Sequence, residues 1–174
     1  MIERTLVIVK PDGVKRNLVD EILKRYTDAG LKIVARKTVT ATKELAEKHY
    51  TDSEEQIVGM GNKTLAVAGE DGTRKIFGTN NPREIGMVLR GWSIEFLISG
   101  PVVAVVLEGE DTVEKVRKIT GFTDPSKAEK GTIRGDLGDD SILKANEERR
   151  ATRNLIHAAG NKEEAGREIK LWFD

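Results

Sequence analysis

The sequence predicts an α+β protein in which a small antiparallel sheet packs against helices. Short apolar, β-branched runs alternate along the chain with stretches whose apolar residues recur at helical spacing. The chain has 174 residues, of which 38% are hydrophobic and 33% charged, a balance typical of a globular protein with one sizeable core. We therefore expect a single domain over residues 1–174.

The first half of the chain predicts two strands and two helices. Residues 5–9 form a β-branched apolar run that stops at a Pro-Asp-Gly turn. Apolar residues then recur at helical spacing over 19–26, and a glycine at position 30 supplies the stop. Residues 31–39 alternate well enough for a second strand, and 42–50 are typical of a helix capped by a threonine.

The second half predicts two more strands and two more helices. Residues 101–107 are apolar on both faces, which favours a central strand. A helix is expected over 111–119, a short last strand over 154–157 and a closing helix over 163–169. This order suits a ferredoxin-like α/β sandwich, an antiparallel four-stranded sheet with helices packed against a face.

Two stretches fit this scheme poorly and are interpreted as surface insertions on the one domain. Residues 52–81 are rich in Gly, Asn, Asp and Thr, which favours a turn-rich excursion. We expect it to lie outside the catalytic core, in or near a subunit contact, with its apolar residues packed on this chain or on a neighbour. The second stretch is 137–150.

Composition excludes several classes of protein. Lys+Arg and Asp+Glu number 29 each, and a neutral chain argues against a nucleic-acid partner but permits self-association. There is no cysteine, so neither a disulfide framework nor a Cys/His zinc site is expected. The chain begins without a basic and apolar leader, and its longest apolar run, 102–107, is too short for a membrane span. We therefore expect a cytoplasmic protein with no membrane partner.

Four residues are candidates for chemistry. His49 lies in a charged helical run and is most simply a surface residue, whereas His157 ends an apolar strand and precedes small residues that leave its ring accessible. Arg134 lies between glycines in a loop, where its guanidinium could bind phosphate oxygens. Lys10 follows a strand, at the end where α/β sites usually lie. Taken alone, each has an ordinary structural interpretation, such as a solvated turn or a packed ring.

Five sequence motifs, in the same order as in the family, favour a functional interpretation of these residues. Through them the chain resembles the nucleoside diphosphate kinases from Met1 to Phe173. The motifs are Lys10-Pro11-Asp12-Gly13, Glu47-Lys48-His49-Tyr50, Ser99-Gly100-Pro101-Val102-Val103, Gly131-Thr132-Ile133-Arg134-Gly135-Asp136 and Arg153-Asn154-Leu155-Ile156-His157. Each motif is weak alone, but together they span nearly the whole chain and are specific.

The resemblance implies a role for each matching position. His157 would be the nucleophile that carries the phosphate, Tyr50 would lie beside it, and Glu168 would bind its other ring nitrogen. The nucleotide would be bound by Lys10, which also counts as catalytic, and by Arg117, Thr123, Arg134 and Asn154. No metal site on the protein is implied, because Mg²⁺ would be held by the nucleotide phosphates.

The resemblance also implies the reaction. The γ-phosphate of a nucleoside triphosphate, typically ATP, would pass to a nucleoside diphosphate by a ping-pong mechanism through phosphohistidine. Such a protein balances nucleotide pools, uses Mg²⁺ as its cofactor and forms homo-oligomers, either hexamers or tetramers.

Three departures from the family pattern concern the base site, a second loop and the phosphate site. The region 50–101 is longer than in short members, where it supplies a phenylalanine under the base; Leu89 aligns with that ring and Trp92 is nearby. A similar stretch over 77–82 is typical of long, archaeal-type members. The loop that follows Arg134 is also longer. Ala159 replaces the family's serine, so we expect weakened catalysis and a higher kcat in Ala159→Ser.

Two other functions are alternatives to the enzyme, a nucleotide-binding protein without catalysis and an RNA-binding module. A nucleotide-binding relative without catalysis would show decay at the site residues, and those residues are intact. An RNA-binding module on a similar fold would need aromatic residues on its strands and a basic face, and the strands have neither. Formation of GTP from ATP and GDP would be expected only of the enzyme.

Overall fold

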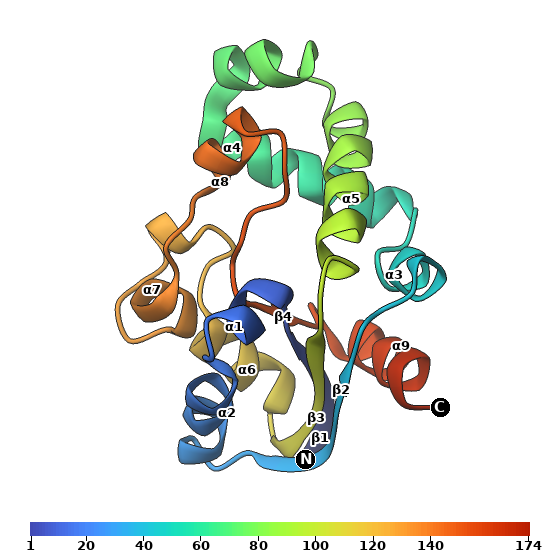
Figure 1. The fold of residues 1–174 in the computed structure, drawn as a ribbon, viewed down its shortest axis with the longest axis vertical. Helices are drawn as coiled ribbons and strands as arrows, with labels where there is room; N and C mark the ends of the chain where they lie inside the picture. The colour runs from blue at the N-terminus through green and yellow to red at the C-terminus, as the bar shows by residue number, and fades with distance from the viewer.

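The computed structural model of the protein describes residues 1–174 (Figure 1). Its strands are β1 (Ile2–Val9), β2 (Lys32–Val39), β3 (Val102–Glu110) and β4 (Ile156–Ala158). Its helices are α1 (Pro11–Lys15), α2 (Val19–Asp28), α3 (Lys43–His49), α4 (Glu54–Phe77), α5 (Pro82–Leu97), α6 (Thr112–Thr120), α7 (Ile133–Leu137), α8 (Ile142–Glu147) and α9 (Lys162–Phe173), with a 3₁₀ turn at Pro125–Lys127.

The four strands form one antiparallel sheet in the order β2-β3-β1-β4. The two central strands, β1 and β3, are buried on both faces where they pair, as their continuous apolar runs require. Strand β2 is an edge strand and is largely exposed. The predicted ferredoxin-like architecture is therefore confirmed, including the central position of the strand expected over 101–107.

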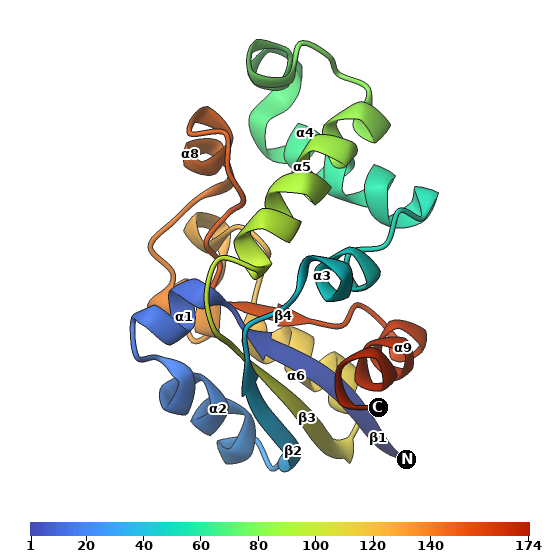
Figure 2. The ribbon, with the colours of Figure 1, turned by 45° about the vertical axis from the view of Figure 1, so that its right-hand side comes forward.

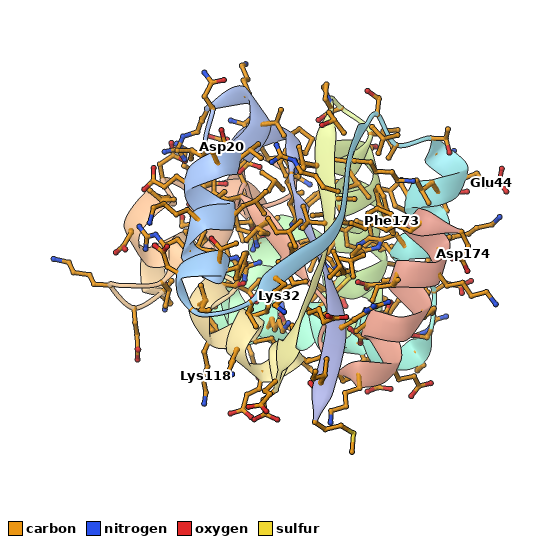
Figure 3. All side chains as sticks on the ribbon, turned by 90° about the horizontal axis from the view of Figure 1, so that it is seen from below. Asp20, Lys32, Glu44, Lys118, Phe173 and Asp174 are labelled. Atoms are coloured by element: carbon orange, nitrogen blue, oxygen red, sulfur yellow. The ribbon has the colours of Figure 1, made fainter.

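Helices cover both faces of the sheet, rather than one face as the sequence suggested. One core cluster joins Val7, Val9 and Val105 to residues of α2 and α6, and the other joins Leu6 and Ile8 to residues of α3, α5 and α9. Seen from below, α2 and α9 lie on opposite sides of the strands (Figure 3). Successive side chains of a strand point to opposite faces of the sheet. Because β1 and β3 carry continuous apolar runs, both faces of the sheet must be covered by helices.

The expectation that 52–81 is a turn-rich excursion is wrong. It is mostly the long helix α4, which packs against α5 as a hairpin and lies beside α8 (Figures 1 and 2). Ser53 caps α4 and Asn81 caps α5, the latter followed by Pro82 at the first helical position. A kink occurs at Gly69, whose φ of 70° lies in the left-handed region. No helix, α4 included, is both long and apolar enough to cross a membrane.

Two glycines in this region serve helix packing rather than turns. A Cβ at Gly61 would lie 1.9 Å from the backbone oxygen of Pro82, and a Cβ at Gly86 would lie 1.9 Å from that of Ile57. The backbones of α4 and α5 thus approach as closely as glycine permits. The relative position of the two helices is fixed by this contact.

The second insertion, 137–150, contains α8 and is held by a buried carboxylate. Arg150 donates to both oxygens of Asp140, at 2.7 and 3.0 Å, and the backbone N–H of Arg153 donates to the same carboxylate at 2.8 Å. Asp140 is only 7% exposed, and a buried carboxylate is destabilising unless hydrogen bonds and a positive charge compensate it, as these three contacts do. The segment leads directly into the stretch before β4.

Gly86→Ala should lower the free energy of unfolding by about 1–3 kcal/mol, because the added methyl group forces α4 and α5 apart. Gly91→Ala on the same helix is the matched control, since a Cβ there meets nothing within 4 Å. The control should be neutral or gain up to about 1 kcal/mol from helix propensity. Urea denaturation of both variants measures the difference, and equal effects would contradict the close contact.

Candidate active site

Strand register brings the end of β1 to the start of β4. Ile8 pairs with His157, and the backbone N–H of Lys10 donates to the oxygen of Leu155 at 2.8 Å. Leu155 is buried with a φ of 72°, a left-handed conformation that costs a non-glycine residue about 1–3 kcal/mol. The carboxylate of Asp12 accepts from the N–H of Leu155 at 3.0 Å. These bonds hold the strained turn that leads into His157.

The side chain of His157 lies on the face covered by α3 and α9, because directly paired residues share a face and Ile8 packs there. Its Nε2 is 2.8 Å from Oε2 of Glu168, a carboxylate on α9 that is 2% exposed. With Nε2 donating to this carboxylate, the proton is held on Nε2 and Nδ1 keeps its lone pair. No other hydrogen bond to the ring is formed, so Nδ1 is free.

Burial keeps the imidazole neutral. It lowers the pKa of His157 to about 3, and the positive charges of Lys10 and Arg134 act in the same direction. Burial also raises the pKa of Glu168, a rise that His49 and Arg167 oppose. A neutral ring with one free nitrogen is the nucleophilic form of histidine at pH 7.

His49 is not a surface residue, contrary to the expectation from its charged neighbours. It is 2% exposed, and its ring centroid lies 4.4 Å from that of His157. The indole N–H of Trp172 donates to Nδ1 of His49 at 3.2 Å, because the end of α3 packs against α9. Burial lowers the pKa of His49 well below its ordinary value. The ring of Tyr50 lies farther from His157, at 6.5 Å between centroids.

Lys10 and Arg134 are buried cations held by neutral groups. Lys10 is 9% exposed and donates to Oδ1 of Asn154 at 2.8 Å, while Nδ2 of Asn154 donates to the backbone oxygen of Thr123 at 3.0 Å. Arg134 is 8% exposed and donates to the backbone oxygens of Asn154, Gly121 and Ile156. Burial lowers the pKa of Lys10 to about 8 and that of Arg134 to about 10.

One cavity of about 510 Å³ is lined by all eight residues to which the family resemblance assigns catalysis or nucleotide binding. Lining it are Lys10, Tyr50, Arg117, Thr123, Arg134, Asn154, His157 and Glu168. The side chain of Arg117, in the last turn of α6, forms no hydrogen bond and no ion pair. The cavity therefore combines a free imidazole nitrogen with cations that have no carboxylate partner.

The insertion also contributes to this cavity, so the expectation that it lies outside the catalytic core is wrong. Met60 and Lys63 of α4 line it, as does Leu89 of α5. Trp92 does not line it and instead packs 5.6 Å from the ring of Phe77. The residues of α4 that face the cavity recur at helical spacing in the sequence. That spacing is hard to recognise because Gly59 and Gly61, which are typical of turns, lie among them.

Phe122 and Ala159 differ in whether they reach the cavity. Phe122, just after α6, lines the cavity and is 48% exposed, a large apolar group open to a ligand. Ala159 is 1% exposed and packs with Val113 and Ala165 instead of lining the cavity. The gain in kcat expected for Ala159→Ser stays a prediction, which steady-state kinetics of that variant measures.

The protein's own side chains do not form a magnesium cage. The one cluster suited to an ion consists of His49, His157 and Glu168, and two of these residues already share a hydrogen bond. Magnesium prefers several oxygen ligands, which this nitrogen-rich cluster does not offer. The donor set is compatible with a metal that is held mainly by ligand phosphates.

Comparisons with known proteins agree with this geometry. The family model for nucleoside diphosphate kinase matches residues 3–70 and 91–174. A nucleoside diphosphate kinase of Pyrobaculum aerophilum is 46% identical over 99% of this chain and 95% of its own length, and one of Pyrococcus abyssi is 41% identical over 98% and 84%.

Solved structures show the same similarity. The crystal structure of an NDP kinase from Pyrobaculum aerophilum has a TM-score of 0.93 at 46% identity, covering 100% of this chain and 97% of that one. A transition-state mimic of the Borrelia burgdorferi nucleoside-diphosphate kinase with bound vanadate and ADP has a TM-score of 0.77 at 35% identity, covering 99% and 88%. By sequence, fold and the groups lining its cavity, the chain belongs to the nucleoside diphosphate kinase family, enzymes that transfer phosphate between nucleotides.

Proposed function

We propose that this chain transfers the γ-phosphate of a nucleoside triphosphate, typically ATP, to a nucleoside diphosphate through phosphohistidine at His157. One observation carries the proposal. The hydrogen bond to Glu168 occupies Nε2 of His157, and the free Nδ1 belongs to a ring that lines a cavity of unpaired cations. This pairs a nucleophile with a site for a polyanion.

The chemical step divides transfer into two similar halves. The lone pair on Nδ1 of His157 attacks the γ-phosphorus, an N–P bond forms, and the bond between phosphorus and the bridging oxygen breaks. The diphosphate leaves with that electron pair. The Nε2 proton stays in its hydrogen bond to Glu168, which stabilises the positive charge that develops on the ring. An acceptor diphosphate then attacks the phosphohistidine in the reverse sense.

Charge stabilisation is assigned to Lys10, Arg117 and Arg134. Phosphoryl transfer depends mainly on positioning and on neutralised charge, and cations fixed before the ligand arrives supply both. Asn154 and Thr123 hold Lys10 in place through a chain of hydrogen bonds, and Tyr50 closes the wall beside the nucleophile. A Mg²⁺ ion held mainly by the nucleotide phosphates would add to the charge neutralisation that Lys10, Arg117 and Arg134 provide.

A single site used twice implies ping-pong kinetics and broad use of bases. The apolar groups on the cavity wall, among them Leu89 and Phe122, can contact a base face without reading its edge. This suits balancing of nucleotide pools. The ADP and vanadate bound by the similar Borrelia burgdorferi enzyme support the binding of a nucleotide by this chain.

We also propose that residues 1–174 act as one catalytic domain that associates with copies of itself, as a hexamer or a tetramer. The shared cavity supports the single domain, because α4 and α5 line it together with residues of the sheet. The exposed edge strand β2, which includes Ile33 and Val34, supports self-association, since a free edge can pair with a second chain.

Incubation with ATP and Mg²⁺ should add one phosphate to the protein, on His157 and not on His49. The adduct should be acid-labile and base-stable, as expected of a phosphoramidate, and mass spectrometry of peptides locates it. His157→Ala should lose transfer from ATP to GDP by about 10⁴-fold or more, because a covalent route has no substitute nucleophile. A phosphate found on a serine, a threonine or His49 would contradict the mechanism.

The value of kcat/KM should fall as the pH rises through about 8. Lys10 is charged below its pKa of about 8 and loses its charge above it, which weakens phosphate binding by the free enzyme. Bound phosphates favour the charged form, so kcat should stay level to higher pH than kcat/KM. In Lys10→Arg the profile should stay level past pH 8, whatever its absolute rate, since arginine remains charged. A wild-type kcat/KM that is constant to pH 10 would refute this role.

A further inference from the structure

One face of helix α4 lines the cavity. The lining residues of this helix are Glu55 and Gln56, Gly59 and Met60, and Lys63 and Thr64. They recur every four residues, so they form one stripe on the helix surface. The stripe places Lys63 on the wall of the same cavity as Arg117, Arg134 and His157.

The position of Lys63 is fixed by the packing behind it. Ile57, Gly61 and Thr64 are buried, and the backbone at Gly61 approaches that of Pro82 so closely that no side chain fits between them. This contact prevents α4 from rotating or shifting away from α5. This contact therefore fixes the backbone of α4 with the Lys63 position on the cavity wall.

Lys63 is a cation without a counter-ion. Its side chain forms no hydrogen bond and no ion pair, unlike the side chains of Lys43 and Lys48 on helix α3, which pair with Glu47 and Glu44 respectively. Lys63 is exposed and lines the cavity; the surrounding protein and the charges of Arg117 and Arg134 lower its pKa, and the nearby carboxylate of Glu164 opposes that effect. An ammonium group that shares a cavity wall with Arg117 and Arg134 is repelled by them until an anion binds.

We propose that Lys63 binds a phosphate oxygen of the nucleotide as a fourth cation, supplied by the inserted helix α4. The roles implied by the family resemblance fall on Lys10, Arg117 and Arg134, and none falls on α4. The proposal rests on the proposed function, because it needs a polyphosphate in the cavity. A long side chain at the mouth suits an outer phosphate contact that strengthens binding of both di- and triphosphates.

Calorimetric titration with GDP tests the proposal without turnover. Lys63→Met should bind GDP about tenfold more weakly than the wild type, and Lys63→Arg should recover most of the loss. Guanosine, which has no phosphate, should bind all three proteins alike. Lys75→Met is the matched control, because Lys75 lies on the same helix, is exposed and does not line the cavity. The loss should shrink in high salt.

The outcomes separate this proposal from the proposed function. If Lys63→Met and Lys63→Gln both bind GDP as the wild type does, or lose no more affinity than Lys75→Met, the role of Lys63 is overturned. Lys63→Gln serves as the readout if Lys63→Met does not fold. If wild-type protein takes no phosphate on His157 while Lys63→Met still loses affinity for GDP, the covalent mechanism fails and the role of Lys63 stands.

Discussion

The hydrogen bond between Glu168 and His157 is the interaction on which the rest of the site depends. It joins the last helix to the last strand, two elements that meet only because β4 pairs with β1 in a register that turns His157 toward α9. A one-residue slip in that register would place the ring on the opposite face, away from Glu168. The strained, buried Leu155, held by Asp12, lies next to this pairing. The fold therefore fixes the tautomer of the nucleophile before any ligand arrives.

Around this bond the chain accumulates positive charge that it does not neutralise. Lys10 and Arg134 are buried against amide and carbonyl oxygens, and Arg117 and Lys63 have no polar partner. The two buried cations, Lys10 and Arg134, destabilise the free protein, because neutral acceptors offset only part of their lost hydration. A polyphosphate offsets the rest, so the same arrangement that costs stability favours a ligand with several negative charges. The site thus trades folding stability for preorganised charge.

Much of the fold could be predicted from the sequence, because β1, β3, α2 and α6 have strong local periodicity that tertiary packing reinforces. The helical nature of 54–77 could not, since glycines needed for contact between helices look like turn residues in a single sequence. Coverage of both sheet faces was also missed, although the two-sided apolar character of β1 indicated it.

The site could be predicted largely through the family resemblance rather than through local chemistry. His49 shows the limit of local reasoning, since its charged neighbours face solvent while its own side chain is covered by Trp172, far along the chain. Lys63 shows another limit, because only the packing of α4 on α5 reveals which way its stripe faces. The resemblance places Trp92 near the base beside Leu89; in the structure Leu89 lines the cavity, and Trp92 packs against the ring of Phe77 instead.

The most direct test of the central claim is the protonation state of the two ring nitrogens of His157, measured by nitrogen-15 NMR of the free enzyme at pH 7. The chain has only two histidines, and a His157→Gln variant assigns the signals. The account predicts a proton on Nε2, none on Nδ1, and no change of state until the pH approaches about 3. A proton on Nδ1, or a doubly protonated ring at pH 7, would contradict it, because the nitrogen proposed to attack phosphorus would then have no free lone pair.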